Sequence, residues 1–395
     1  MKVLRSGGVP ILSWADDLEE KTLAQARNLA LLPFAIDHVA LMPDAHVGYG
    51  MPIGGVLFAD RAVVPYAIGV DIGCGVSLLE TDLTVDDLGP HVLDALLARL
   101  ASRIPVGFEH HRGGVDRDRA ESEIGLPRPG GVQEDWLAHA LPQLGTLGSG
   151  NHFLEVQRDA EGSVAVMLHT GSRSLGKAIC DAFHRRALAL CARRGLPLPH
   201  RELAWLPDDE PDHADYLAAM RYALRYAEVN RSRILDAVEA SLASTTRVSR
   251  LARTIDIHHN FAATEHHAGP DGRSVEGLVH RKGAVRATAG APVLVPGSMG
   301  SASWVGVGLG RAESFETCQH GAGRTMSRTA ARHARTSGEV FAELERTGIR
   351  LHAGDPRDVA EEAASAYKDV DHVMALSADL VRPLRRLTPL AVLKG

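Results

Sequence analysis

Residues suited to metal and phosphate chemistry are spread along most of this chain, in short Gly-rich segments separated by helical patterns. The candidates run from Asp71 to Lys394 of the 395 residues. This distribution requires distant segments to fold back around one site. We therefore expect one large α+β domain that covers residues 1–395, not a series of independent modules.

Apolar periodicity predicts the elements that separate these segments. A capping-box pattern at Ser13–Asp16 predicts a helix that runs to about Leu32, before Pro33. Further helices are expected over residues 90–103, after residue 173, over 216–242 and from residue 324 to about 346. Strands are expected at residues 62–70, 164–169, 275–280, 292–295 and 304–307. The polar stretch at residues 112–129 is expected to be a surface insertion.

The composition narrows the class of protein. The hydrophobic share of 45% and the charged share of 23% are ordinary for a soluble globular protein. No apolar run approaches the roughly 20 residues that span a bilayer, and the first residues lack the apolar core of a secretory signal. The four cysteines show no spacing typical of disulfide-rich scaffolds. We therefore expect a cytoplasmic protein with reduced thiols and no membrane partner.

The net charge of −6 does not exclude a nucleic-acid partner, because phosphate binding requires only a local basic stripe. Two groups of side chains are candidates for such a stripe: Arg281-Lys282 with Arg286, and Arg324 with Arg328. Clusters of this kind more often form an ordinary solvated face. The 20 histidines are more informative, because histidine is the commonest metal ligand.

One group of residues has the chemistry of a metal site. Asp71 and Cys74 flank Gly73 after an apolar run, and the glycine permits a tight turn that directs a carboxylate and a thiol together. Histidines that could complete the set are His152, His169 and the pair His258-His259. A second carboxylate and histidine occur in Asp44-Ala45-His46.

Each of these residues, taken alone, more often has an ordinary structural role than a ligand role. As a set in Gly-rich or strand-end contexts they predict a metal site. Thiolate and imidazole favour zinc, whereas manganese prefers oxygen donors, and two ions that share Cys74 would also fit, so the ion stays open. The pairs His110-His111 and His266-His267 lie in polar stretches and are expected at the surface.

Three Gly-rich loops suit phosphate binding. They are His169–Arg173, Pro296–Ser303 and His320–Arg324. Free backbone N–H groups at a helix start form an anion site, and an arginine adds a bidentate donor. None of the loops matches a P-loop or a dinucleotide-binding fingerprint, which argues against kinase and Rossmann interpretations. Phosphate chemistry is therefore the leading hypothesis.

His320 stands at the head of the third loop, where a neutral imidazole could attack phosphorus directly. This loop is expected to open a helix over residues 326–335, and the positive end of a helix would disfavour protonation of the ring. The alternative is a histidine that only caps this helix.

Taken together, these segments resemble the RtcB family of RNA-splicing and repair ligases, in the order that the family has. The matching segments are residues 42–46, 70–75, 148–155, 169–176, 258–260, 279–283, 295–303, 320–324, 365–371 and 393–395. The resemblance covers nearly the whole chain. It implies an RtcB-type α+β fold with β-sheets around one deep metal-binding cleft.

The resemblance also implies residue roles. It implies that one or two Mn²⁺ ions are held by Asp71, Cys74, His152, His169 and His259, with Cys74 bridging. It implies that His320 takes GMP from GTP through a phosphoramidate. The residues that would hold the guanylate are Asn151, Glu155, Asn260, Pro296, Gly297, Ser298, Met299, Ser303, Gly321, Ala322, Gly323 and Lys394. Arg173 and Arg324 would face the RNA ends or the transferred phosphates.

The activity implied is the joining of an RNA 2′,3′-cyclic phosphate or 3′-phosphate end to a 5′-hydroxyl end, in RNA repair or tRNA splicing. One alternative is a metal-dependent phosphoesterase that acts on RNA ends without guanylylation. Another is an RNA-binding module without catalysis. The physiological RNA, the oligomeric state and the need for an archease-like activating partner stay open.

Overall fold

The computed structural model describes residues 1–5, 7–111 and 115–395. Its largest element is an eight-stranded sheet in which β10, β6, β8, β7, β18, β15 and β14 are neighbours in that order, with β17 pairing on β18. The strands are β6 (Gly75–Thr84), β7 (Phe153–Arg158), β8 (Ser163–Thr170), β10 (Leu251–His258), β14 (Pro292–Val295), β15 (Ser303–Gly308), β17 (Arg350–Ala353) and β18 (Val381–Lys394). Residues from both halves of the chain therefore meet in one sheet.

A second, six-stranded sheet has the order β1, β2, β3, β4, β12, β11. Its strands are β1 (Lys2–Leu4), β2 (Ile11–Ser13), β3 (Ala35–His46), β4 (Ile53–Ala59), β11 (Asn260–Ala268) and β12 (Ser274–Lys282). Among the described residues, two short pairs complete the strands: β5 (Ala62–Val63) with β9 (Leu206–Pro207), and β13 (Ala284–Arg286) with β16 (Thr317–Gln319).

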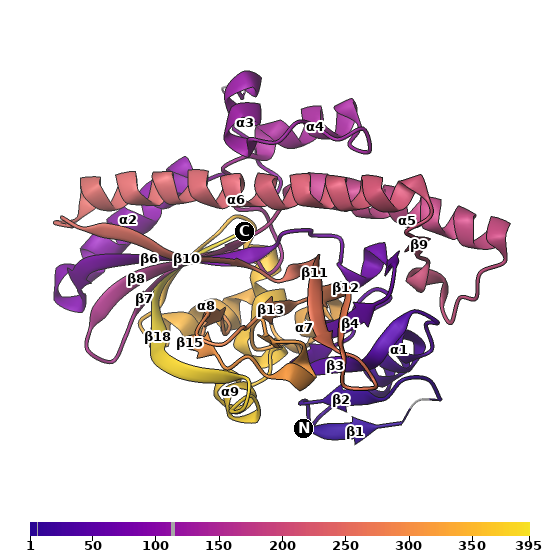
Figure 1. Ribbon diagram of the computed structural model, residues 1–395. Helices are drawn as coiled ribbons and strands as arrows, with labels where there is room; N and C mark the ends of the chain where they lie inside the picture. The colour runs from indigo at the N-terminus through magenta and orange to yellow at the C-terminus, as the bar shows by residue number, and fades with distance from the viewer. Residues whose placement is uncertain (6, 112–114) are drawn as a thin grey trace.

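Helices surround these sheets, and some of them pack on other helices instead of on a strand (Figure 1). They are α1 (Glu20–Ala30), α2 (Pro90–Arg103), α3 (Arg117–Ile124), α4 (Glu134–Ala140), α5 (Arg173–Arg194), α6 (Pro211–Thr245), α7 (Arg328–Ala334), α8 (Ser337–Arg346) and α9 (Val370–Leu376). The long helix α6 lies across one side of the molecule and contacts α2, α5 and strand β8. The architecture is therefore mixed α and β, as the sequence predicts.

Amphipathic spacing explains why α2 forms where it was predicted. Pro90 occupies the first turn, where its missing N–H costs no hydrogen bond. Leu93, Leu96, Leu97 and Leu100 recur at helical spacing and are all buried against the large sheet and α6. Burial of each leucine contributes about 2 kcal/mol. The expected strands at residues 164–169, 275–280, 292–295 and 304–307 are likewise confirmed, within β8, β12, β14 and β15.

Three element predictions are wrong. Ser13 does not cap a helix, because it lies in β2 beside β3, and α1 begins only at Glu20. The run at residues 62–70 is not one strand: β5 ends at Val63 and Pro65 starts a short 3₁₀ helix, since proline has no amide hydrogen for a sheet. The helix expected from residue 324 to 346 is divided into α7 and α8, because Thr336 forms a new N-cap with Glu339.

Two predictions about the surface also need correction. His267 lies in β11 with 8% of its side chain exposed, 2.9 Å from Glu265, while His266 is exposed as expected. His111 is half-buried against Gly145 O, whereas His110 is exposed. The polar stretch at 112–129 lies partly outside the described residues, and its described part contains α3. In the part of the chain described, no helix is both long and apolar enough to cross a membrane.

Candidate active site

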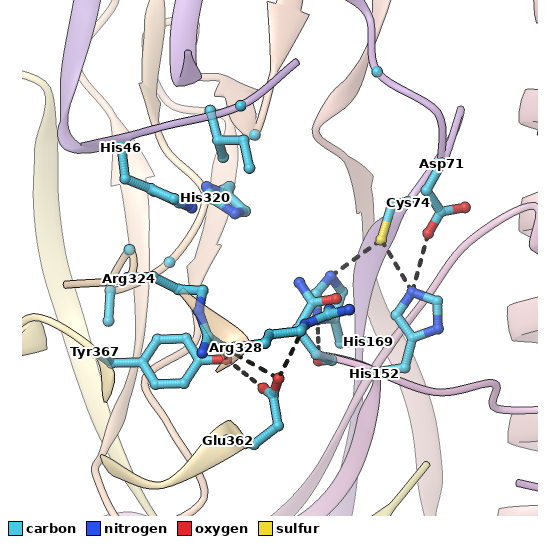
Figure 2. Close-up of a pocket in the computed structure, with 18 of the residues that line it drawn as sticks. His46, Asp71, Cys74, His152, His169, His320, Arg324, Arg328, Glu362 and Tyr367 are labelled. Carbon is cyan, nitrogen blue, oxygen red and sulfur yellow. Dashed lines mark hydrogen bonds and ion pairs between the residues drawn. The ribbon is translucent and has the colours of Figure 1, made fainter. Parts of the chain in front are cut away.

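A cavity of about 950 Å³ lies where the two sheets meet. It is lined by residues of β3, β8, β12 and β18, and by the loops around Asp71, Ser298 and His320. Segments from the first fifth of the chain to its last residues therefore contribute to one cleft. Figure 2 shows the cleft with a cysteine–histidine cluster on one side and His320 with His46 on the other.

The turn that carries Asp71 and Cys74 is built around Gly73, whose φ of +75° favours glycine. The Cys74 amide donates to Asp71 O over 3.1 Å and closes the turn, and β6 begins at the next residue. The Cys74 carbonyl accepts from the His259 amide over 2.9 Å. Backbone bonds thus connect the turn directly to the segment that carries His259.

The five predicted metal ligands converge in two groups that share Cys74. One group is Cys74, His169 and His259, and the other is Asp71, Cys74 and His152. The Cys74 sulfur lies 3.2 Å from His169 Nε2 and 3.5 Å from His152 Nε2. His169 Nε2 is 3.4 Å from His259 Nε2, and His152 Nε2 is 3.0 Å from the Asp71 carboxylate. The geometry therefore provides two adjoining donor sets with a thiol between them.

The other ring nitrogens fix the orientation of two of these histidines. His152 Nδ1 lies 3.0 Å from Leu147 O, and His169 Nδ1 lies 3.1 Å from Asn151 O. Each Nδ1 can donate to its carbonyl, so each Nε2 lone pair is directed into the cleft, the arrangement typical of histidine ligands. The fit to a divalent cation rests on this donor set of thiol, imidazole and carboxylate.

Burial governs the electrostatics of the cluster. Burial lowers the pKa of His169 and of His259 well below the usual value, and it raises the pKa of the Cys74 thiol well above it. Neutral imidazoles are the form that binds metals, and a bound cation would favour the thiolate form of Cys74.

His320 is held by one buried carboxylate. Its Nδ1 lies 2.7 Å from Asp44 Oδ2, and its backbone amide donates to the same oxygen over 3.1 Å. Asp44 is fully buried, while 12% of the His320 side chain is exposed at the cavity. With Nδ1 donating to Asp44, the Nε2 lone pair of His320 is free. The ring centroid lies 4.8 Å from that of His259, so the candidate nucleophile adjoins the candidate metal site.

The prediction that the loop of His320 opens a helix is wrong. His320 follows β16, and α7 begins only at Arg328. Its neighbour on the other side is His46, whose Nδ1 lies 2.9 Å from Asp44 O. Burial lowers the pKa of His46 to about 4.

Most of the residues predicted to hold a guanylate line the cavity. These are Asn151, Asn260, Pro296, Gly297, Ser298, Met299, Gly321, Ala322, Gly323 and Lys394. Glu155 and Ser303 do not line it: both are buried, and Gln157 links them with bonds of 2.5 Å to Glu155 and 3.1 Å to Ser303. Lys394 donates to the carbonyls of Gly150 and His152, the latter over 2.9 Å.

The two predicted phosphate arginines line the cavity with their side chains anchored. Arg173 donates to Thr146 Oγ1 over 3.3 Å and to Gly107 O over 3.4 Å. Arg324 donates to Glu362 over 3.2 Å and to Tyr367 Oη over 3.1 Å, and its guanidinium lies over the Tyr367 ring (Figure 2).

One proposed basic stripe is wrong. Arg281 is fully buried, and its guanidinium pairs with Glu265 over 2.6 and 2.9 Å. Lys282 is also buried, and it donates to the carbonyls of Tyr49 and Tyr66. Of these two, only Lys282 reaches the cavity wall.

Comparison with known proteins identifies one family over nearly the whole chain. The family model described as tRNA-splicing ligase RtcB matches residues 25–395. The RNA-splicing ligase RtcB of Escherichia coli K12 is 36% identical over an alignment that covers 100% of this chain and 99% of the relative. The tRNA-splicing ligase RtcB of Thermococcus kodakarensis is 35% identical, with 98% and 95% covered. This chain belongs to the RtcB family.

A third RtcB relative, the RNA-splicing ligase of Mycobacterium tuberculosis H37Rv, is 38% identical over 94% of this chain and 100% of its own length. The RtcB resemblance drawn from the sequence is thus confirmed over the full chain.

Sequence reasoning missed two features of this RtcB cleft. Asp44 was noted only as a second carboxylate, and its contact with His320 joins residues 276 positions apart. Glu362 was not noted, although it is buried and pairs with Arg324. The sequence signal for Asp44 was its segment with His46, but nothing local marked Glu362.

Proposed function

We propose that this protein is an RNA ligase that uses GTP and Mn²⁺ to join RNA 2′,3′-cyclic phosphate or 3′-phosphate ends to 5′-hydroxyl ends. The names of its relatives support ligation of RNA. The observation that carries the chemical proposal is His320, fixed through Nδ1 and its amide by Asp44 and placed beside His259. A hydrolase that acts on RNA ends would need the metal cluster but not an oriented second nucleophile.

In the first step, the free Nε2 of His320 attacks the α-phosphorus of GTP. The N–P bond of a phosphoramidate forms, the bond to the β-phosphate oxygen breaks, and pyrophosphate leaves. Asp44 keeps the proton on Nδ1 and stabilises the positive charge that develops on the ring. The structure supports this assignment because Nδ1, and not Nε2, has the carboxylate partner.

In the following steps the GMP passes to RNA. Water opens a 2′,3′-cyclic phosphate to a 3′-phosphate and restores the 2′-hydroxyl. An oxygen of the 3′-phosphate then attacks the phosphorus on His320, and the N–P bond breaks. Finally the 5′-hydroxyl attacks the activated 3′-phosphate, a phosphodiester forms, GMP leaves, and the hydroxyl proton passes to solvent.

Asp71, Cys74, His152, His169 and His259 would hold one or two Mn²⁺ ions, with Cys74 shared. Bound there, the metal would neutralise phosphate charge and help to orient the reacting groups. The same donor set also suits zinc, so the identity of the ion is part of the proposal.

The cavity walls next to His320 suit a guanylate. The backbone N–H groups of Met299, Gly321 and Gly323 can face phosphate and ribose oxygens, because these residues line the cavity and the glycines allow close approach. Lys394 would donate to the guanine carbonyl oxygen and so favour GTP over ATP. Glu155 and Ser303, behind the cavity wall, would support this pocket through Gln157.

Arg173 and Arg324 would bind RNA-end phosphates, since both line the cavity. We also propose that residues 1–395 form one catalytic unit in the cytoplasm. An archease-like partner would accelerate guanylylation. Measuring ligation turnover with and without such a partner tests whether it is needed.

The test of the reaction class uses an RNA with a 2′,3′-cyclic phosphate and one with a 5′-hydroxyl, incubated with GTP and Mn²⁺. We expect a joined, phosphatase-resistant product that requires GTP. Release of inorganic phosphate or a 3′-phosphate without joining, independent of GTP and unaffected in His320→Ala, would instead establish the phosphoesterase.

A further inference from the structure

The middle of α6 contains two consecutive polar residues that are buried, Asn230 and Arg231. Their exposed fractions are 0% and 1%. Burial of an arginine is unfavourable unless a carboxylate balances its charge and most of its N–H groups donate hydrogen bonds. Neither residue lines the cavity, so neither can contact a substrate there. Their partners indicate what they do.

Arg231 connects two segments that carry metal-ligand candidates. Its Nη1 donates to Gly73 O over 2.9 Å, inside the turn that carries Cys74. The same nitrogen donates to Thr170 O over 3.3 Å, one residue after His169. One guanidinium nitrogen thus fixes the backbone next to two members of a single donor set.

The other nitrogens of the Arg231 guanidinium contact the segment that carries His259, the third member of this donor set. Nε and Nη2 donate to the Asp256 carboxylate over 2.5 and 3.2 Å. Asp256 lies in β10, three residues before His259, and its carboxylate also accepts from Ser77 of β6 over 2.8 Å. Arg231 therefore joins the segments of Cys74, His169 and His259.

Asn230 makes the corresponding contacts on the side of His152. Its Oδ1 accepts from the amides of Gly145 and Thr146 over 2.7 and 3.2 Å, and its Nδ2 donates to Thr146 O over 3.2 Å. This loop continues into Leu147, whose carbonyl lies 3.0 Å from His152 Nδ1. Asn230 Nδ2 also lies 3.4 Å from Thr170 Oγ1, which donates to the same Leu147 carbonyl over 2.7 Å.

The turn at Gly73 is seated directly on α6. A Cβ placed on Gly73 would lie 3.0 Å from Ala227 Cβ and 3.2 Å from Leu224 Cα. A larger residue at this position would push the turn away from the helix. The close seat and the Arg231 bond act on the same residue, so α6 fixes both the position and the orientation of the turn.

We propose that Asn230 and Arg231 are positioning residues for the metal ligands, with Arg231 acting mainly on one ligand group and Asn230 mainly on the other. Arg231 aligns Cys74, His169 and His259, and Asn230 aligns His152 through Leu147. This inference rests on the metal-binding part of the proposed function. It adds the residues of α6 that hold the ligand segments in place. Such residues influence metal affinity because they orient the ligands.

Arg231→Lys is the sharpest substitution. Lysine keeps the charge, but its donors all sit on one nitrogen and cannot form the two-pronged pair with Asp256 while also reaching both carbonyls. In a Mn²⁺ titration of metal-free protein, the ion that His259→Ala removes should bind about 10- to 100-fold more weakly in Arg231→Lys. The ion that depends on His152 should weaken less. In Asn230→Ser, the ion that depends on His152 should weaken more than the ion that His259→Ala removes.

Arg253→Lys is the matched control. Arg253 also links β10 to α6, through Asp236 and Glu239, but on the exposed side and without contact to a ligand segment. It should bind Mn²⁺ like the wild type. Amide hydrogen exchange at Gly73 and Cys74 in the metal-free protein is a second readout, independent of activity, and should be faster in Arg231→Lys only.

The outcomes separate the two proposals. If the wild type binds no Mn²⁺, the proposed Mn²⁺ site is wrong, and the positioning role that rests on it is wrong as well. If the wild type binds it and Arg231→Lys binds equally well, only the positioning role is wrong. Equal weakening in Arg253→Lys would also contradict it, because general loosening of α6 would then suffice. Should Arg231→Lys fail to fold, Asp256→Asn replaces it and should weaken the same ion.

Discussion

Asp44 Oδ2 accepts two hydrogen bonds from a single residue, His320: one from the ring Nδ1 at 2.7 Å and one from the backbone amide at 3.1 Å. The first bond selects the tautomer and the second fixes the backbone from which the ring projects. Together they leave His320 Nε2 as the nitrogen that would react in the proposed guanylylation. The arrangement is that of a nucleophile or base oriented by a buried carboxylate.

Asp44→Asn should therefore slow guanylylation by about 10²- to 10⁴-fold, because the amide keeps the shape but not the charge. Single-turnover labelling with GTP measures the rate. Asp37→Asn is the matched control, since Asp37 contacts His38 Nδ1 over 2.6 Å and neither residue lines the cavity. A wild-type rate in Asp44→Asn would show that the carboxylate does not orient the nucleophile.

Cys74→Ala should lower Mn²⁺ binding at both ion positions, because Cys74 belongs to both ligand groups, whereas His259→Ala should affect one. Bound metal per chain after gel filtration gives the answer. Cys191→Ala, a buried cysteine in α5, controls for the loss of a thiol. Two ions retained in Cys74→Ala would mean that the sulfur is not shared.

Stability should depend on pH through Glu155. Burial raises its pKa to about 8 from 4.5, in spite of the hydrogen bond from Gln157 and the charge of Lys394. Between about pH 4.5 and 8 the folded state therefore keeps the proton while the unfolded state loses it. The free energy of unfolding falls as pH rises through this window, by at most about 5 kcal/mol.

Denaturant unfolding of Glu155→Gln beside the wild type tests this dependence. Glutamine does not titrate, so Glu155→Gln should lack this loss of stability. The unfolding free energy of the variant minus that of the wild type should therefore increase from pH 5 to pH 8. A difference that does not change with pH would show that Glu155 is ionised throughout.

Arg173→Lys should reduce RNA sealing more than guanylylation, by a further factor of about 10 or more, because lysine cannot match the fork geometry of a guanidinium on phosphate. Both rates are measured on the same preparation. Arg186→Lys, a change in α5 at a residue that pairs with Asp212, is the control. Equal losses in both reactions would place Arg173 with the nucleotide and not with the RNA.

Local patterns predicted the elements best where one periodicity and one end signal coincide, as in α2 after Pro90. They failed where pairing with a distant strand determines the local structure. At Ser13 the sequence has a helix-capping pattern, but the residue pairs with β3 instead. At Pro65 a missing amide hydrogen interrupted an apolar run.

The metal-ligand candidates of the site could be predicted from the sequence, but the contacts that position them could not. Cys74, His169 and His259 could be proposed because each follows a strand-like run or a glycine, and they do converge. The contacts of Asp44 with His320 and of Arg231 with Gly73 could not be proposed, because no local pattern links the two residues of either pair. A buried arginine in a helix reads locally as a surface residue.

The most direct test of the account is labelling of the purified protein with α-³²P-GTP and Mn²⁺, followed by denaturing electrophoresis, with His320→Ala alongside. The account predicts a labelled protein band in the wild type that is acid-labile, alkali-stable and absent in His320→Ala. An unlabelled wild type with confirmed metal loading, or a label that persists in His320→Ala, would contradict it.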